Sequence, residues 1–339
     1  MKAVFAVPGE IESPTGGYGY ARRLLAGLPA EGVETTHLAL PLPAGDGHEA
    51  EILELLASVP AGTPILLDGL AGGALPGEAL AALPCPVAML CHHPLADEAG
   101  LEAGERARLA TSERAALTAA DLVLTTSHAT ATTLVGTYGV PHRKIVVAPP
   151  GTEPASPAAG SDSEVCQILS VGSLTPRKGH HMLLDALAKA GATSWHLRIA
   201  GHAPEPDFAA ALARRAARLG LSDRVEFLGP LEPEALAAAY HRSDLFALAS
   251  VYEGFGMAFA EAVARGLPTL GISSAAVREA TQGAALLVTP KALPDALARL
   301  IAEPAYRQEL AEAAARQAPN LARWPETLRV VAGALGRLP

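Results

Sequence analysis

The chain has 339 residues, a length that predicts two domains, each large enough for its own core. Apolar residues make up 50% of the sequence and charged residues 18%, a composition that excludes a largely disordered protein. The formal net charge of -9 argues against a general nucleic-acid-binding protein, because such proteins neutralise phosphates with Lys and Arg.

The cysteines and the first residues predict the cellular compartment. Cys85, Cys91 and Cys166 are an odd set without a C-x-x-C pair, which disfavours a disulfide framework and a zinc ribbon. Residues 1–10 run directly into a strand pattern, without the features of a signal peptide. Gly and Pro interrupt the apolar stretches well before the length of about 20 residues that a membrane span needs. We therefore expect a soluble, cytoplasmic protein without a transmembrane segment.

The first half of the chain alternates short apolar runs with segments rich in Ala, Leu, Glu and Arg. The runs predict strands buried on both faces, at residues 3–7, 35–40, 64–68, 87–91, 122–126 and 145–148. The segments between them predict helices at residues 20–28, 49–58, 77–83, 105–119 and 129–138. This alternation indicates a parallel, doubly wound sheet.

The second half repeats the same alternation. Strands are predicted at residues 167–171, 197–200, 225–228, 245–249, 269–272 and 285–288. Helices are predicted at residues 178–190, 207–219, 233–243 and 256–264, and the pattern is helical from residue 290 to the end, with a last helix at 325–335.

A segment of linker composition separates the two halves. Residues 148–163 contain four Pro and two Gly without periodicity. We therefore expect Rossmann-like domains of the α/β class at residues 1–152 and 153–318, with residues 319–339 as a helix that packs back on the first domain. Open sheets of this kind bind ligands at the carboxyl ends of their strands, so two of them would face each other across a cleft.

Two adjacent cations follow the first strand of the second domain. In residues 170–179, Thr175 is a plausible N-cap and Pro176 the first helical residue, so that Arg177 and Lys178 fall in the first turn. The helix dipole disfavours cations there, and the pair is better explained by a bound anion such as a diphosphate. The alternative is a pair of solvated charges.

A Gly-rich segment with two glutamates follows the strand at 245–249. Gly254 and Gly256 permit a tight turn and a close approach of the backbone to a ligand. Glu253 would lie in the loop and Glu261 in the helix, so both carboxylates could accept hydrogen bonds from one polyhydroxyl ligand. A surface glutamate and an ordinary helical glutamate are the alternative reading.

Two loops of the first domain are also candidates. Residues 14–19, Pro-Thr-Gly-Gly-Tyr-Gly, lie between the first strand and its helix, and they would let the backbone pack against a phosphate or a sugar. This loop lacks the G-x-G-x-x-G fingerprint, and a simple turn is the alternative. The sequence Cys-His-His-Pro at 91–94 ends a strand, with His92 and His93 as competing candidates and a structural histidine as the alternative.

Other residues carry weaker signals. Asp68 closes a strand and could contact an acceptor, although a turn-forming Asp before Gly69 is the better interpretation. No H-x-x-x-H, C-x-x-C or D-x-D spacing occurs, so we expect no metal ligands.

In this order, the residues resemble the donor site of the retaining GT-B glycosyltransferases of family 4, the glycosyl transferases group 1. The resemblance rests on the Arg-Lys-Gly segment at 177–179, the glutamates separated by seven residues, the Gly-rich first loop, the His-x-Pro and the linker. It extends over most of the chain. It departs at residues 274–279, Ser-Ala-Ala-Val-Arg-Glu, where the family often has Gly-Gly-x-Pro-Glu, and this puts the local geometry of the nucleotide loop in doubt.

The resemblance implies a role for each matching position. Arg177 and Lys178 would clamp the diphosphate, Glu253 would contact the donor sugar and Glu261 the ribose hydroxyls. His92 would lie beside the anomeric carbon. The remaining donor contacts would come from backbone at Gly16, Gly17, Gly254, Phe255, Gly256 and Leu228, of which Leu228 would abut the nucleobase.

The implied reaction transfers a glycosyl group from a nucleotide diphosphate sugar, a UDP-sugar rather than a GDP-sugar, to a hydroxyl acceptor with retention. Arg177, Lys178 and helix termini would stabilise the leaving diphosphate, so no cofactor and no metal is expected. No pair of carboxylates has the arrangement of a hydrolase nucleophile and acid. In the front-face mechanism that the resemblance implies, the leaving phosphate takes the acceptor proton.

Other functions remain open at this point. A nucleotide-sugar epimerase or a phosphorylase could share two such domains, and a non-catalytic sugar-nucleotide-binding protein would bind the donor without turnover. Residues 1–150 hold 8 Lys and Arg against 16 Asp and Glu, so attraction to anionic lipids would be weak. We expect a small soluble or saccharide acceptor and no nucleic-acid partner, with peripheral membrane contact not excluded.

Overall fold

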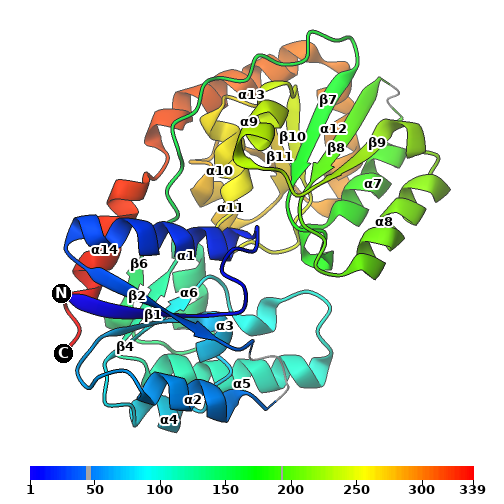
Figure 1. Cartoon of the computed structure of the whole chain (residues 1–339). Helices are drawn as coiled ribbons and strands as arrows, with labels where there is room; N and C mark the ends of the chain where they lie inside the picture. Colours follow the sequence, from blue (N-terminus) through cyan, green and yellow to red (C-terminus); the bar gives the residue numbers. More distant parts are fainter. Residues whose placement is uncertain (43–46, 192–193) are drawn as a thin grey trace. The chain divides into compact units, whose positions relative to one another are not determined.

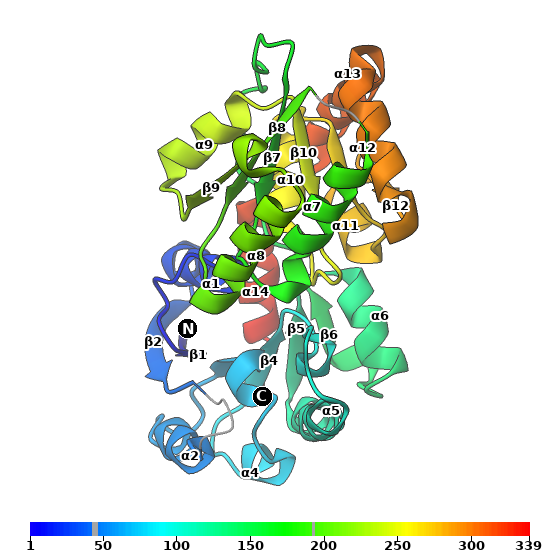
Figure 2. The ribbon, with the colours of Figure 1, turned by 90° about the vertical axis from the view of Figure 1, so that its right-hand side faces the viewer.

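The computed structural model describes residues 1–42, 47–191 and 194–339. They form two compact units, Met1–Gly151 with Ala322–Pro339, and Thr152–Leu321. The sequence predicted domain changes at 152/153 and 318/319, and the units change at 151/152 and 321/322. Within the described residues, each unit contains one parallel six-stranded sheet with helices on both faces (Figures 1 and 2). The predicted α/β, doubly wound class is confirmed.

The sheet of the first unit has the strand order β2-β1-β3-β4-β5-β6. Its strands are β1 (Lys2–Pro8), β2 (Glu34–Leu40), β3 (Ile65–Asp68), β4 (Val87–Cys91), β5 (Leu122–Thr125) and β6 (Ile145–Val147). The chain order reverses between β1 and β3, which makes this the topological switch point. A doubly wound sheet binds ligands outside the carboxyl ends of the strands at such a point.

Helices cover both faces of this first sheet. They are α1 (Gly16–Gly27), α2 (Glu49–Ala57), α3 (Gly69–Gly72), α4 (Gly77–Ala81), α5 (Ala103–Ala119), α6 (His128–Gly136) and α14 (Trp324–Leu335). Alternate strand residues such as Leu67 and Met89 pack with Ile52 of α2 and Leu117 of α5 in one buried cluster. Figure 1 shows α1 and α14 on the opposite side of the sheet from α2, α4 and α5.

The sheet of the second unit has the order β12-β11-β10-β7-β8-β9. Its strands are β7 (Cys166–Val171), β8 (Trp195–Ala200), β9 (Val225–Gly229), β10 (Leu245–Leu248), β11 (Thr269–Ile272) and β12 (Leu286–Val288). Numbered within the unit, this is the 3-2-1-4-5-6 order of dinucleotide-binding sheets, with its switch point between β7 and β10.

Helices cover both faces of the second sheet and pack against alternate residues of its strands. They are α7 (His180–Lys189), α8 (Pro206–Arg218), α9 (Pro233–His241), α10 (Met257–Ala264), α11 (Ala275–Ala280), α12 (Leu293–Ala302) and α13 (Pro304–Gln317). Ile168 belongs to the buried cluster with α7, α8 and α12, whereas the next residue, Leu169, packs with α9 and α10. Because neighbouring strand residues point to opposite faces, a continuous apolar run supplies both cores.

All twelve predicted strands are confirmed, with shifts of one or two residues at some ends. The predicted start of the first helix is wrong. Helix α1 begins at Gly16, so Gly16, Gly17 and Gly19 form its first turn instead of a loop, because the Thr15 hydroxyl caps the backbone N–H of Tyr18. Helix α11 was not predicted at all, although Ser274 caps it through the N–H of Val277.

The last helix packs against the rest of the first unit. The Thr327 hydroxyl of α14 donates a 2.6 Å hydrogen bond to the carbonyl of Pro149, and a Cβ on Gly151 would lie 2.2 Å from the backbone nitrogen of Trp324. A Cβ on Gly27 of α1 would likewise lie 2.4 Å from the side chain of Leu328. Glycine is therefore needed at Gly151, where the clash is with backbone, whereas at Gly27 the side chain of Leu328 would have to shift.

No helix in the described part of the chain is both long enough and apolar enough to cross a lipid bilayer.

Candidate functional site

The segments that follow β7 and β10 meet at the switch point of the second sheet. These two strands pair directly, with Ile168 opposite Leu245 and Leu169 opposite Phe246. The segment after β7 carries Arg177 and Lys178, and the segment after β10 carries Glu253. The sheet topology therefore brings together charged side chains that are about 75 residues apart in sequence.

The cationic pair lies in a short 3₁₀ turn, Pro176–Lys178, and α7 begins only at His180. The prediction that both cations lie in the first turn of the α-helix is therefore wrong. Thr175 makes no side-chain cap, and Gly179 ends the turn with φ +66°. A left-handed residue with no Cβ redirects the chain between the turn and the helix.

Gly179 also packs against the residue that follows β10. A Cβ at this position would lie 1.9 Å from the carbonyl oxygen of Ala249. Two hydrogen bonds then tie Arg177 to the next residues: its carbonyl accepts from the N–H of Val251 at 2.8 Å, and its guanidinium donates to the carbonyl of Tyr252 at 3.1 Å. The turn and the segment after β10 are thus fixed to each other through backbone groups.

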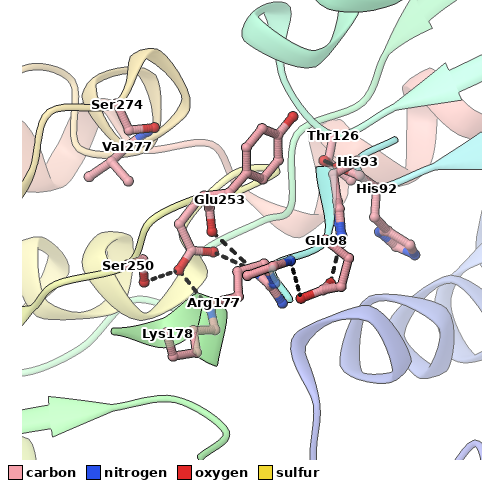
Figure 3. Close-up of polar contacts among 12 residues, drawn as sticks. His92, His93, Glu98, Thr126, Arg177, Lys178, Ser250, Glu253, Ser274 and Val277 are labelled. Atoms are coloured by element: carbon pink, nitrogen blue, oxygen red, sulfur yellow. Dashed lines mark hydrogen bonds and ion pairs between the residues drawn. The ribbon is translucent and has the colours of Figure 1, made fainter. Parts of the chain in front are cut away.

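Glu253 is the buried anionic centre of this group, with 8% of its surface exposed. Its carboxylate lies 2.7 Å from Nζ of Lys178 and 3.7 Å from the guanidinium of Arg177, and it accepts a 2.7 Å hydrogen bond from the hydroxyl of Ser250 (Figure 3). Burial opposes ionisation of Glu253, but the attraction of Lys178 and Arg177 outweighs it and lowers the pKa of the carboxyl group. Glu253 is therefore a carboxylate at neutral pH.

The backbone of the Gly-rich segment follows directly. Gly254 and Gly256 are buried, and Phe255 packs with Ala260 and Ala280 in a small apolar cluster. Gly256 has φ +107° and is the N-cap of α10, which has no side-chain cap. Helices α7 and α10 follow the two switch-point strands, and each begins after a left-handed glycine without a side-chain cap.

Glu261 lies in α10 and has different partners from Glu253. It accepts a 3.0 Å hydrogen bond from the hydroxyl of Tyr240, a fully buried residue of α9. The guanidinium of Arg265 stacks 4.5 Å from the centre of the Tyr240 ring. Burial raises the pKa of Glu261, although the Tyr240 hydrogen bond and the charge of Arg265 oppose the rise. Tyr240 thus fixes one carboxylate oxygen of Glu261.

Leu228 lies near the end of β9, two strands from β7 on the side opposite β10. It is half-buried, and the next residue, Gly229, has φ +68° and accepts a 2.9 Å hydrogen bond from the N–H of Gly201. The carboxyl ends of β8 and β9 are therefore joined by this bond just beyond a shift of register between Ile199 and Ala200. Leu228 therefore lies two strands away from the β7/β10 pair that carries the charged group of Glu253.

His92 lies at the switch-point edge of the first sheet, directly after β4. Its Nε2 is 3.4 Å from a carboxylate oxygen of Asp68, the last residue of β3, and its ring meets Tyr20 of α1 edge-on at 5.6 Å. A Cβ on Gly17 would lie 3.7 Å from the same Nε2. The first turn of α1 therefore faces the imidazole, and the missing side chain at Gly17 leaves room beside it.

Asp68 and the backbone fix the position of His92. The other oxygen of Asp68 accepts a 2.9 Å hydrogen bond from the N–H of Leu70 and caps α3, as expected for an Asp before Gly. The hydroxyl of Thr126 donates to the carbonyl of His92 at 3.1 Å. Within the described residues, the buried Nε2 of His92 approaches Asp68 at 3.4 Å but makes no hydrogen bond of normal geometry.

His93 points to a different partner, since its Nε2 lies 3.2 Å from a carboxylate oxygen of Glu98 (Figure 3). Of the two histidines, His92 is the one that lies beside Gly17 and Asp68 at the sheet edge. This geometry favours His92 over His93 as the functional residue of the first unit.

The structure therefore groups the predicted residues by unit: Arg177, Lys178 and Glu253 in one, Gly17 and His92 in the other. Sequence reasoning missed Ser250 and Tyr240, which hold the two glutamates. Ser250 lies three residues before Glu253 at a strand end, a spacing that could have indicated it. Tyr240 is on another helix and carries no local signal.

In the described ranges, no three His, Cys, Asp or Glu side chains are grouped as metal ligands.

The fold has clear counterparts among solved structures. Sucrose-phosphate synthase from Thermosynechococcus elongatus aligns with a TM-score of 0.79 at 22% identity, covering 99% of this chain and 98% of that chain. HepE from Anabaena, solved in complex with UDP and glucose, aligns with a TM-score of 0.74 at 19% identity over 100% of both chains. Two doubly wound domains in one chain, as in these proteins, are typical of the GT-B class of fold.

The sequence matches two families in succession. Residues 68–156 match Glycosyltransferase Family 4, and residues 152–320 match the family described as glycosyl transferases group 1. The chain belongs to the group 1 glycosyltransferases, as the resemblance of its motifs predicted.

Two curated relatives illustrate the sequence similarity. D-inositol 3-phosphate glycosyltransferase of Rhodococcus opacus is 36% identical over 217 residues, which cover 57% of this chain and 48% of the relative. Mannosylfructose-phosphate synthase of Agrobacterium fabrum is 32% identical over 170 residues, which cover 44% and 37%. The chain thus spans about half the length, or less, of these curated relatives.

Proposed function

We propose that this protein transfers a glycosyl group from a nucleotide diphosphate sugar to a hydroxyl group of an acceptor, and that its second unit binds the donor. The observation that carries the proposal is the group at the β7/β10 switch point. There, two cations pair with the buried carboxylate of Glu253, and the helices α7 and α10, which follow the two strands, begin without a side-chain cap. Such a site suits a diphosphate, because cations and helix N-termini both attract anions.

The ion pairs of Glu253 support a specific sequence of events. In the free protein, Glu253 neutralises Lys178 and interacts with Arg177. A diphosphate would bring two negative charges to the same cations and take over their hydrogen bonds. Glu253 would then be released to accept hydrogen bonds from the sugar hydroxyls, the role that the family resemblance gives it. We propose in the same way that Glu261, with one oxygen held by Tyr240, offers the other to the ribose hydroxyls.

We further propose a retaining, front-face reaction without a metal or other cofactor. The bond between the anomeric carbon and the phosphate oxygen breaks, and the acceptor oxygen attacks the same face. The acceptor proton passes to the leaving phosphate. Arg177 and Lys178 stabilise the negative charge that develops on the diphosphate, which is the main electrostatic demand of this step. His92 would contact the sugar beside the anomeric carbon.

Two narrower proposals concern the nucleobase of the donor and the chemical class of the acceptor. We favour a UDP-sugar, because HepE, which has the same fold, was solved with UDP and glucose. The names of the relatives include an inositol phosphate glycosyltransferase and a mannosylfructose-phosphate synthase, which favours phosphorylated polyols and sugars as first acceptors to test.

The proposal is tested by incubating the protein with a panel of UDP-sugars and GDP-sugars and following nucleotide release by mass spectrometry. We expect slow hydrolysis of one donor in the absence of acceptor, undiminished by EDTA, and faster release when the acceptor is added. NMR of the product should show the anomeric configuration of the donor. Phosphate-dependent cleavage would favour a phosphorylase, a new epimer would favour an epimerase, and binding without turnover would favour a non-catalytic protein.

Replacement of His92 separates catalysis from nucleotide binding. Because His92 and the Glu253 group belong to different units, His92→Ala should lower kcat at least about tenfold while the calorimetric affinity for UDP changes less than about twofold. His93→Ala is the comparison variant. If His93→Ala lowers kcat more than His92→Ala does, the catalytic role belongs to His93.

Replacement of Glu261 tests the ribose contact. Glu261→Ala should weaken UDP binding by about 1–3 kcal/mol, because a half-buried, hydrogen-bonding carboxylate is lost. Tyr240→Phe should weaken it less, since Glu261 remains but is no longer held. Glu234→Ala, an exposed position on α9, is the control and should leave the calorimetric affinity unchanged. Native affinity for UDP in Glu261→Ala would contradict the assignment.

A further inference from the structure

A buried carboxyl group in the first unit has no part in the reaction as proposed so far. Glu113 lies on α5, and only 1% of its surface is exposed. Acidic side chains are almost never buried to this degree unless they have partners. The position of Glu113 therefore requires a structural explanation.

Its partners lie in the segment that follows His92. A carboxylate oxygen of Glu113 accepts a 2.8 Å hydrogen bond from the backbone N–H of Leu95. Leu95 opens a short 3₁₀ turn, Leu95–Asp97, and the guanidinium of Arg106, also on α5, donates to the carbonyl of Ala96 in the same turn. Helix α5 therefore holds this turn at two backbone groups, three and four residues after His92.

Glu113 also contacts the elements on either side of this turn. The hydroxyl of Tyr138, which follows α6, is hydrogen-bonded to its carboxyl group. A Cβ on Gly73, at the end of α3, would lie 3.2 Å from Cγ of Glu113 and 2.9 Å from the side chain of Leu95. Helix α3 is the one that Asp68 caps. The carboxyl side chain of Glu113 thus lies beside both the turn that follows His92 and helix α3, which follows Asp68.

The charge state of Glu113 follows from its surroundings. Burial raises its pKa to about 8, and the nearby charge of Asp97 adds to the rise, whereas the hydrogen bonds from Leu95 and Tyr138 oppose it. Two further titratable groups lie close to it, the hydroxyl of Tyr138 and the fully buried thiol of Cys91 on β4, and burial raises the pKa of both. Near neutral pH Glu113 is therefore mostly protonated.

We propose that Glu113 is a positioning residue for His92, which it orients by holding the Leu95–Asp97 turn against α5. The contact with Leu95 is independent of the proposed function, and the effect on turnover rests on the role proposed for His92. Ionisation of Glu113 at alkaline pH places a buried negative charge beside Asp97. The turn can relieve this by opening toward water, so the orientation of His92 depends on pH.

Two variants separate the hydrogen bond from the charge. Glu113→Gln keeps an acceptor for the N–H of Leu95 but cannot ionise, whereas Glu113→Met fills a similar volume without an acceptor. Glu105→Gln makes the same change at an exposed position of α5 and is the control.

The first readout is hydrogen exchange of the Leu95 amide by NMR, with the imidazole resonances of His92 followed in the same samples. Exchange at Leu95 should accelerate about tenfold or more in Glu113→Met, and the His92 resonances should shift, whereas both should stay near native in Glu113→Gln and Glu105→Gln. Native protection of Leu95 in a folded Glu113→Met protein would overturn the proposal. Lost protection with unshifted His92 resonances would overturn it as well.

The second readout is the pH dependence of stability, which also serves if Glu113→Met does not fold. A raised carboxyl pKa contributes stability that is lost as pH rises from about 4.5 toward about 8, and Gln has no such loss. The difference in Tm between Glu113→Gln and the native protein should therefore shift in favour of the variant by several degrees between pH 5 and pH 8.5. The protection of the Leu95 amide from exchange should fall over this pH range only in proteins that retain Glu113. A constant difference in Tm would contradict burial of a titrating Glu113.

The third readout is donor hydrolysis, which separates this proposal from the proposed function. Glu113→Met should lower kcat with unchanged affinity for UDP, and the alkaline decrease of kcat near pH 8 should be absent in Glu113→Gln. If native protein shows no turnover but Leu95 and His92 respond as expected, the positioning role stands and the proposed function fails. Lower affinity for UDP with unchanged kcat would overturn the positioning role.

Discussion

Gly179→Ala should destabilise the second unit strongly and abolish nucleotide binding. Gly179 has φ +66°, a conformation that costs other residues about 1–2 kcal/mol, and its new Cβ would lie 1.9 Å from the carbonyl oxygen of Ala249. The turn Pro176–Lys178 and the end of β10 would have to separate to make room. With overpacking at about 1–3 kcal/mol, we expect a total loss of about 2–5 kcal/mol.

A matched glycine separates the two causes of this effect. Gly220, after α8, has φ +70°, but a Cβ there would meet nothing within 4 Å. Gly220→Ala should therefore cost only the conformational part, with native affinity for UDP. Urea unfolding and calorimetry on both variants test this, and equal losses of stability would show that close packing at Gly179 is not what holds the turn.

Lys178→Met should reduce the affinity for UDP at least about tenfold and also destabilise the free protein. The reduction in affinity follows from the loss of a charge-assisted contact to the diphosphate, about 1.5–3 kcal/mol. The loss of stability arises because Glu253, 8% exposed, would remain buried with its closest cation removed. Since Lys178 contributes to the lowered pKa of Glu253, the loss of stability should be larger at pH 7 than below the usual carboxyl pKa.

A second substitution distinguishes these two effects. Adding Glu253→Gln to Lys178→Met removes the unpaired charge and should restore most of the stability, but not the affinity for UDP. Lys189→Met, an exposed position of α7, is the control and should change neither quantity. Restored affinity for UDP in the double variant would mean that Lys178 does not contact the diphosphate.

Periodicity and apolar runs predicted the strands well, because a strand buried on both faces needs a continuous apolar sequence whatever its neighbours are. The local backbone of the two Gly-containing motifs was harder to predict. Residues 16–19 suggested a loop, yet the Thr15 cap and the packing of Tyr20 against His92 and Trp324 stabilise a helical turn there. At residues 176–179, the turn ends where Gly179 closely approaches Ala249. No sequence pattern predicts such a contact, because the two residues follow different strands.

In the candidate site, too, some features could be predicted from the sequence and others could not. The order of Arg177, Lys178 and Glu253 around paired strands followed from the topology of a doubly wound sheet. The contacts that hold Glu261 and the turn after His92 could not be predicted in this way, because Tyr240 and Glu113 act across helices that the sequence does not place beside each other. Glu113 in particular lies in a helix of polar composition, where its burial has no sequence signal.

The central claim is that the group at the β7/β10 switch point binds the diphosphate of the donor. The most direct test is a crystal structure of the native protein with UDP. The account predicts the diphosphate within hydrogen-bonding distance of Nζ of Lys178 and the guanidinium of Arg177, with Glu253 no longer paired to Lys178. A UDP molecule bound elsewhere, with the Lys178–Glu253 pair intact, would contradict it.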